Sequence, residues 1–177
     1  MDEKEEVILV DEADQPLGRM EKLEAHRRAL LHRAFSVFIF NARGEMLLQQ
    51  RAPGKYHSAG LWTNACCSHP RPGEETRDAA VRRLKEELGF TTELVEVFDF
   101  VYRSEFGNGL TEHEFDHVFV GSYDRDPDPD RREVSDYRYQ SMPGIEAALR
   151  VRPDEFTSWF RLAFPILLEK LPSIRKD

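Results

Sequence analysis

Cysteine is scarce in this sequence. Only two cysteines occur among the 177 residues, and they are neighbours, Cys66 and Cys67. Adjacent cysteines rarely close a disulfide with one another, so we expect both thiols to be reduced. Reduced thiols fit a cytoplasmic location.

Long apolar runs and a leader-like N-terminus are also missing. No apolar stretch approaches the roughly 20 residues that a membrane helix needs, and residues 1–6 show no basic region followed by an apolar core. We therefore expect neither a membrane span nor a signal peptide. The chain has no internal repeat and no linker, which predicts a single domain over residues 1–177, present as a monomer or a weak homodimer.

The chain has fewer basic than acidic residues. The chain carries 25 Lys and Arg against 33 Asp and Glu, a net charge of -8. This balance argues against nucleic acid as a partner, because phosphate backbones bind to basic surfaces. A small anionic substrate is still compatible with it, provided that a local basic patch and a divalent cation hold the substrate.

The clearest periodic segment spans residues 74–88. Val81, Leu84 and Leu88 recur there at spacings of three and four, which predicts an amphipathic helix, and Gly89 follows as a stop signal. Apolar segments between turn residues predict strands at 7–10, 35–40, 45–51, 63–70, 94–102, 112–123 and 134–142, with further helices at 144–149 and 153–171. These elements predict an α/β or α+β fold, a mixed β-sheet flanked by helices.

Two clusters of uncommon residues carry the chemistry. Between Trp62 and Pro70, Cys67 and His69 are two residues apart, so both would point to one face of an extended segment. Downstream, Glu112 and Glu114 would share a face in the same way, and like charges side by side are costly unless a cation neutralises them. The clusters together predict a metal site with an acid or nucleophile beside it.

The run from Ser68 to Phe90 resembles the Nudix box, G-x5-E-x7-R-E-U-x-E-E-x-G-U. Glu74, Arg82 and Glu87 match that pattern, whereas Ser68 replaces the opening glycine and Arg83 replaces the first glutamate of the R-E pair. These departures, together with the cysteine motif at 64–70, resemble one Nudix branch, the type I isopentenyl-diphosphate isomerases. Segment 21–36, Tyr102-Arg103 and a late tryptophan extend the resemblance over roughly residues 7–165.

The resemblance implies a Nudix fold with its core at about residues 30–165, and interconversion of isopentenyl and dimethylallyl diphosphates in isoprenoid biosynthesis. It implies that Cys67 and Glu114 carry protons on opposite faces of the substrate. Tyr102 would tune Glu114, and Trp159 would stabilise a tertiary carbocation through its ring face.

The same resemblance implies two metal positions and a diphosphate clamp. The N-terminal segment would contribute to a site for Mn²⁺ or Mg²⁺, with Zn²⁺ or Fe²⁺ as further options, made by His26, His32, His69, Glu112 and Glu114. Glu87 would help to hold a Mg²⁺ on the substrate. The diphosphate would be bound by Lys22, Arg51, Lys55, Ser68 and Arg83.

Simpler interpretations stand beside these assignments. Glu87 could form only a helical ion pair with Arg83, and Trp159 could only pack the core from a C-terminal helix. Cys66 and Trp62 are expected to be structural. His113 and His117 would lie on the strand face opposite Glu114, and His57 has no assignment.

Two other functions use the same fold. A Nudix pyrophosphohydrolase would share the helix, but Arg83 at a carboxylate position weakens the metal cluster that activates water, and hydrolysis has no use for Cys67. A non-catalytic ligand sensor would not need the proton-transfer pair of Cys67 and Glu114.

Overall fold

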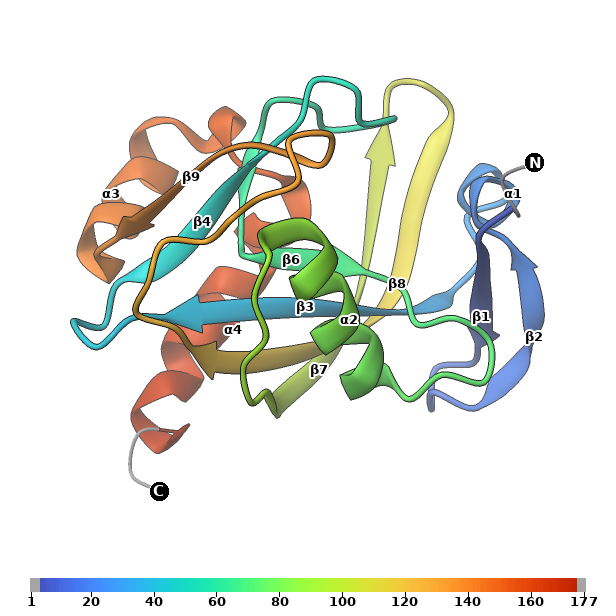
Figure 1. Ribbon diagram of the computed structural model, residues 1–177. Coiled ribbons are helices and arrows are strands. Elements are labelled where there is room, and N and C mark those ends of the chain that lie inside the picture. The colour runs from blue at the N-terminus through green and yellow to red at the C-terminus, as the bar shows by residue number, and fades with distance from the viewer. Residues whose placement is uncertain (1–3, 175–177) are drawn as a thin grey trace.

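The computed structural model describes residues 4–174 and arranges them around one mixed sheet with helices on both faces (Figure 1). Within that range the sheet has nine strands: β1 (Glu6–Val10), β2 (Pro16–Glu21), β3 (His32–Phe40), β4 (Met46–Arg51), β5 (Trp62–Thr63), β6 (Cys66–Ser68), β7 (Val95–Phe106), β8 (Leu110–Ser122) and β9 (Val134–Gln140). The helices are α1 (Lys22–Arg27), α2 (Thr76–Leu88), α3 (Met142–Val151), the 3₁₀ turn η1 (Pro153–Glu155) and α4 (Ser158–Ile174). The predicted fold class is confirmed.

β3 organises the sheet. It pairs antiparallel with β1 and β6 and parallel with β8, and all but one of its nine residues are buried. A strand that is buried on both faces reads as a nearly continuous apolar run, which is the character of Phe35–Phe40. The register of β3 with its neighbours decides which polar side chains meet at its N-terminal half.

The two faces of the sheet have separate cores. Leu84 and Leu88 of α2 pack against Phe35, Val37 and Ile39 on one face. On the other face, α3 and α4 pack against alternate strand residues, with Phe38, Phe156, Phe160 and Phe164 among the largest buried side chains. Figure 1 shows α2 in front of the sheet and α4 behind it.

The predicted strands at residues 35–40 and 45–51 are consecutive in the chain but pair only in part. β3 and β4 pair through Phe40 and Met46, and the two strands then diverge. β4 continues along β9, with pairs from Met46↔Gln140 to Arg51↔Val134. Because the strands separate, the loop at 52–61 is free to fold over the end of the sheet.

α2 ends as its sequence predicts. Gly89 adopts a φ of 77° in the left-handed region, where a residue with a Cβ is strained. A Cβ at this position would also lie 2.5 Å from the carbonyl oxygen of Asp128. The glycine therefore serves both the helix end and the close approach of the 124–132 loop.

The N-terminal segment folds onto the sheet as a hairpin followed by a short helix. β1 and β2 pair over Glu6–Glu21, and Leu9 pairs with His32 of β3. This arrangement places α1 beside β8, next to β1 and β2. The prediction of one domain over 1–177 stays a prediction, since residues 1–3 and 175–177 lie outside the described part of the chain. No helix within residues 4–174 is long and apolar enough to cross a membrane.

Candidate active site

A cleft of about 610 Å³ opens at the end of the sheet where β6, β7 and β8 meet α2 and the 52–61 loop. Of the residues predicted from sequence, twelve line it: Lys22, Arg51, Lys55, Cys67, Ser68, His69, Arg83, Glu87, Tyr102, Glu112, Glu114 and Trp159. The other two, His26 and His32, are fully buried beneath them. The structure therefore gathers all predicted residues at one place.

Strand register brings one group of potential metal ligands together. Glu114 of β8 pairs with His32 of β3, and its Oε1 lies 3.5 Å from the Nε2 of His32 and 2.9 Å from the Nε2 of His69. The two imidazole Nε2 atoms are 3.3 Å apart. With His26, these side chains offer ligand atoms that all lie within 4.8 Å of one another.

Glu112 belongs to a second, adjoining group. Its Oε1 lies 3.9 Å from the Nε2 of His26 and 2.9 Å from the Nε2 of His57. His26, His57 and Glu112 again have ligand atoms within 4.8 Å of one another, so His26 is shared by both groups. Four of the five predicted ligands therefore form one group, and Glu112 lies in the second. His57, which the sequence left unassigned, accompanies Glu112 there.

Backbone carbonyls orient two of these imidazoles. The Nδ1 of His26 lies 2.6 Å from the carbonyl oxygen of Lys22, and the Nδ1 of His32 lies 2.8 Å from that of Leu30. A carbonyl can only accept, so each Nδ1 carries the proton, and each Nε2 presents its lone pair to the carboxylates. Imidazoles held in this way beside carboxylates are the donor set that suits a divalent metal.

The buried carboxylates and imidazoles shift one another's pKa. Burial by itself would raise the pKa of Glu114, but His32 and His69 outweigh it and hold that pKa well below its ordinary range. The pKa of Glu112 is also lowered, against burial and the charge of Glu114, by its contacts with His26 and His57. Burial lowers the pKa of His69, whereas Glu112 and the carbonyl of Lys22 outweigh burial and raise the pKa of His26. The carboxylates are therefore ionised and His69 is neutral at pH 7.

Tyr102 joins the two carboxylates. It pairs with Glu114 across β7 and β8, and its hydroxyl donates to Glu114 Oε2 at 2.5 Å while lying 2.9 Å from Glu112 Oε2. Burial and the two carboxylate charges raise the pKa of Tyr102 well above its usual value. Tyr102 is therefore a fixed neutral donor to the carboxylate pair.

Cys67 lies on β6 opposite Ser36 of β3. Its thiol donates to the Oδ1 of Asn64 at 3.1 Å, and the hydroxyl of Ser36 lies 3.4 Å away. Burial raises the pKa of Cys67, and the nearby charge of Asp116 adds to that effect. The thiol is thus protonated at neutral pH. Cys66 points the other way, into the core beneath α2.

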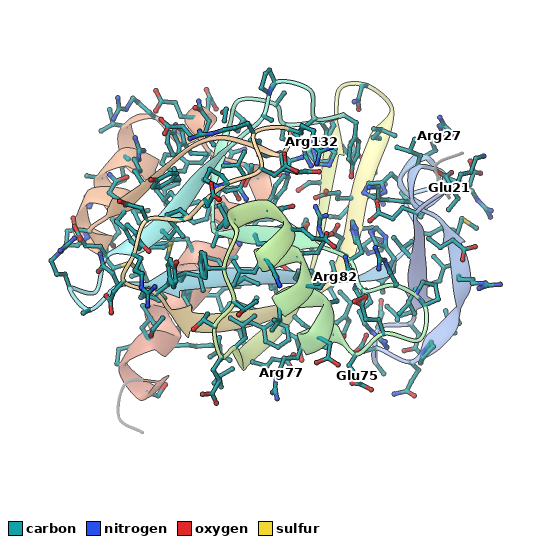
Figure 2. The ribbon with its side chains drawn as sticks, viewed as in Figure 1. Glu21, Arg27, Glu75, Arg77, Arg82 and Arg132 are labelled. Carbon is teal, nitrogen blue, oxygen red and sulfur yellow. The ribbon has the colours of Figure 1, made fainter. Side chains whose placement is uncertain are left out.

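Three of the four predicted diphosphate-binding cations are already paired with carboxylates. The ammonium of Lys22 contacts Glu5, that of Lys55 contacts Glu133, and Arg83 contacts Glu87 at 2.7 Å. Arg82, which lies on the side of α2 nearer to β1 in Figure 2, is 2.7 Å from Glu74. The helical pair of Arg83 and Glu87 is therefore present, and both residues still face the cleft.

The two tryptophans occupy different surroundings. Trp159, at the start of α4, is buried, lines the cleft and has the guanidinium of Arg51 5.1 Å from its ring centre. Trp62 does not line the cleft, and the guanidinium of Arg138 lies 4.1 Å from its ring centre. Only Trp159 is placed to touch a molecule in the cleft.

The family model of the NUDIX domain matches residues 30–160 of this chain. A protein of Pectobacterium atrosepticum named "Isopentenyl-diphosphate Delta-isomerase" is 54% identical over 159 residues, which is 90% of this chain and 89% of the relative. A protein of Burkholderia multivorans with the same name is 49% identical, over 93% of this chain and 96% of the relative. The chain belongs to the isopentenyl-diphosphate Delta-isomerase family.

Solved structures more distant in sequence share the fold of this isomerase family member. A protein of Deinococcus radiodurans matches with a TM-score of 0.71 at 20% identity, over 84% of this chain and 90% of that one. The MutT protein of Methanosarcina mazei matches with a TM-score of 0.64 at 21% identity, over 78% and 94% of the two chains. These similarities establish the Nudix architecture, and the isomerase family assignment rests on the closer relatives.

Sequence reasoning missed three residues at the site of this isomerase family member. His57 lies in an irregular loop, where no periodicity predicts the direction of a side chain. Ser36 is placed only by the β3–β6 register. Asp116 could have been found, because it follows Glu112 and Glu114 at the same two-residue spacing, and it accepts a 2.6 Å hydrogen bond from Ser36. The expectation that His113 and His117 lie on the other face is correct, since they contact Ala29 and Asp14.

Proposed function

We propose that the protein interconverts isopentenyl diphosphate and dimethylallyl diphosphate, with Cys67 and Glu114 as the two proton carriers. One observation carries this assignment. The thiol and the carboxylate reach the same cleft from different strands, β6 and β8, beside a set of buried imidazoles and carboxylates. The family relationship fits the same activity.

The reaction moves a double bond by adding one proton and removing another. A proton is added to the terminal CH₂ carbon of the alkene, which leaves a tertiary carbocation, and a proton then departs from the CH₂ group on the diphosphate side. Because Cys67 rests as a thiol and Glu114 as a carboxylate, the pair supplies one donor and one acceptor. The reverse reaction exchanges their roles.

Stabilising the carbocation requires negative charge nearby and an environment that excludes water. Trp159 offers a buried aromatic ring at the cleft wall, and Glu114 brings a carboxylate that Tyr102 fixes in place. The negative face of an aromatic ring attracts a cation, more strongly where water does not compete. These residues stabilise charge that develops only along the reaction path.

The His/Glu set holds a divalent metal in this proposal. The donors fit such an ion: buried imidazoles and ionised carboxylates whose ligand atoms lie within 4.8 Å in each group. Mn²⁺ or Mg²⁺ is assigned here, and Zn²⁺ or Fe²⁺ suits the same donors. When bound, the metal supplies positive charge that offsets the paired carboxylates and orients Glu114.

The diphosphate occupies the basic wall of the cleft in this proposal. Lys22, Arg51, Lys55 and Arg83 contribute positive charge, and Ser68 contributes its hydroxyl or backbone. Arginine gives bidentate contacts to oxyanions, whereas lysine acts as a point charge. Glu87, at the same wall, provides an oxygen for a Mg²⁺ bound to the substrate.

The decisive experiment uses purified protein, isopentenyl diphosphate and magnesium in deuterated water. We expect dimethylallyl diphosphate as the product, with deuterium taken up from the solvent, measured by NMR and mass spectrometry. Release of phosphate or of a monophosphate as the main product would instead identify a pyrophosphohydrolase. Binding without any turnover or deuterium exchange would identify a ligand sensor.

A further inference from the structure

The side chain of His57 is buried although it comes from an irregular surface loop. Its side chain is 2% exposed, and its ring stacks on Phe106 with centroids 4.3 Å apart and planes 8° apart. Tyr56 and Trp159 contact it edge-on, at 4.4 Å and 5.6 Å between ring centroids. Three aromatic neighbours therefore fix the direction of this imidazole.

The loop itself is tied down at the same residue. The carbonyl oxygen of His57 accepts a hydrogen bond from Arg51 at 3.1 Å, and its Nδ1 lies 3.1 Å from the hydroxyl of Ser58. Ser58 has a φ of 54°, a left-handed conformation that costs free energy for a residue other than glycine. This strained turn aims the Nε2 of His57 inward, away from solvent.

The Nε2 of His57 points at the carboxylate of Glu112 without making a hydrogen bond. It approaches Oε1 at 2.9 Å, yet no hydrogen-bond partner satisfies it among the described residues. The Nε2 of His26 is unsatisfied in the same way, and it faces the same oxygen from 3.9 Å. Two buried imidazole nitrogens without partners, converging on one carboxylate oxygen, are what ligands around a shared cation present.

The other half of the site offers a direct comparison. His69 Nε2 lies 2.9 Å from Glu114 Oε1, the same separation as between His57 Nε2 and Glu112 Oε1. His26 adjoins both pairs. Each carboxylate thus has one buried histidine at 2.9 Å. The two pairs match in separation, while only His69 forms a hydrogen bond with its carboxylate.

We propose that His57 is a further ligand of the metal centre, bound through Nε2 beside Glu112. This inference rests on the metal site assigned under the proposed function. A histidine on the 52–61 loop would couple metal binding to the closure of the cleft wall, because the same loop carries Lys55 and receives a hydrogen bond from Arg51.

Metal binding by matched variants tests the proposal without any turnover. Mn²⁺ affinity is measured by titration for the parent, His57→Ala, His57→Gln, His69→Ala and the control His113→Ala, and Co²⁺ absorption spectra report the coordination. Glutamine can still donate a hydrogen bond to Glu112 but is a poor ligand, and it preserves most of the side-chain volume if alanine impairs folding.

We expect both His57 variants to weaken Mn²⁺ binding at least 10-fold and to change the Co²⁺ spectrum, while His113→Ala binds as the parent does. Parent-like affinity in His57→Gln, or parent-like Co²⁺ spectra in both variants, would overturn the proposal and leave His57 as a group that only orients Glu112. If His69→Ala also binds metal as tightly as the parent, the metal centre itself is misassigned. Loss of binding in His69→Ala alone contradicts only the role of His57.

Discussion

The hydroxyl of Ser36 lies 3.4 Å from the thiol sulfur of Cys67, and its own proton is donated to Asp116 at 2.6 Å. The hydroxyl therefore turns its oxygen toward the thiol. Asn64 accepts the thiol proton from the other side at 3.1 Å. The hydrogen bond to Asn64 sets the direction of the thiol proton, and the Ser36 oxygen is a second polar neighbour of the sulfur.

This relationship predicts the effect of replacing Ser36 by alanine. The thiol would lose one of its two polar neighbours, a contact of about 1 kcal/mol, so we expect turnover to fall by roughly 5-fold with KM nearly unchanged. Metal content should match the parent. Ser36→Thr keeps the hydroxyl and serves as the rescue variant, and equal losses in both variants would mean that packing, not the hydroxyl, is responsible.

Cys67→Ala and Glu114→Gln each remove one proton carrier. Either change should lower turnover by at least the factor of about 10²–10⁴ that is typical of general acid–base groups. Cys67→Ala should leave folding and metal content intact, whereas Glu114→Gln should also weaken metal binding. Steady-state kinetics with isopentenyl diphosphate, beside metal analysis, separates the two effects.

Cys66→Ala is the matched control for Cys67, because Cys66 is fully buried in the core under α2. We expect a small loss of stability and near-parent activity. Loss of activity in Cys66→Ala with a near-parent rate in Cys67→Ala would reverse the roles of the two cysteines, and the proposed mechanism would fall.

Glu87→Gln should separate the substrate-linked magnesium from the buried metal. Glu87 faces the cleft and contacts Arg83, but it is in neither group of buried ligands. We therefore expect a higher magnesium requirement and a higher KM, with the tightly bound metal retained. An unchanged magnesium dependence would show that Glu87 serves only its ion pair and its hydrogen bond from Gln49.

The raised pKa values of the two thiols predict that the free energy of unfolding depends on pH. Burial raises the pKa of both Cys66 and Cys67 above the ordinary value of 9.0. A pKa that is higher in the folded than in the unfolded chain means that the folded chain holds the proton more tightly. The contribution to the free energy of unfolding is therefore complete below about pH 9 and is lost as the pH rises above it.

Alkylation by iodoacetamide and denaturant unfolding measure these effects. We expect slow alkylation of both thiols in the folded protein between about pH 7 and 9, since the thiolate is the reactive form. Unfolding should accelerate alkylation sharply, and unfolding midpoints should drop above about pH 9. Fast modification of folded Cys67 near pH 7 would show that its pKa is not raised.

The periodic parts of the chain could be predicted from sequence, and the loops could not. α2 and its stop at Gly89 follow from apolar spacing and from glycine, which act locally. Alternation along β8 correctly places Glu112 and Glu114 on one face and His113 on the other, because the side-chain period of a strand is two. In these cases, residues close together in the sequence were enough to predict the structure.

Residues fixed by pairing between distant segments were harder to predict. The contact of Ser36 with Cys67 depends on the β3–β6 register, and no residue near either one encodes that register. His57 is directed by a left-handed Ser58 and by aromatic neighbours from β7 and α4. Positions of this kind require the assembled structure.

The ion pairs at the cleft wall have a consequence for how substrate comes and goes. Glu5 and Glu133 act as internal anions that are tethered to the same chain as Lys22 and Lys55. In the proposed binding mode, an incoming diphosphate would exchange with these two carboxylates, and part of its binding free energy would be spent on that exchange. The displaced carboxylates would stay close, at high effective concentration, and return as the product leaves. The two ion pairs would thus limit how tightly the product is held and favour its release.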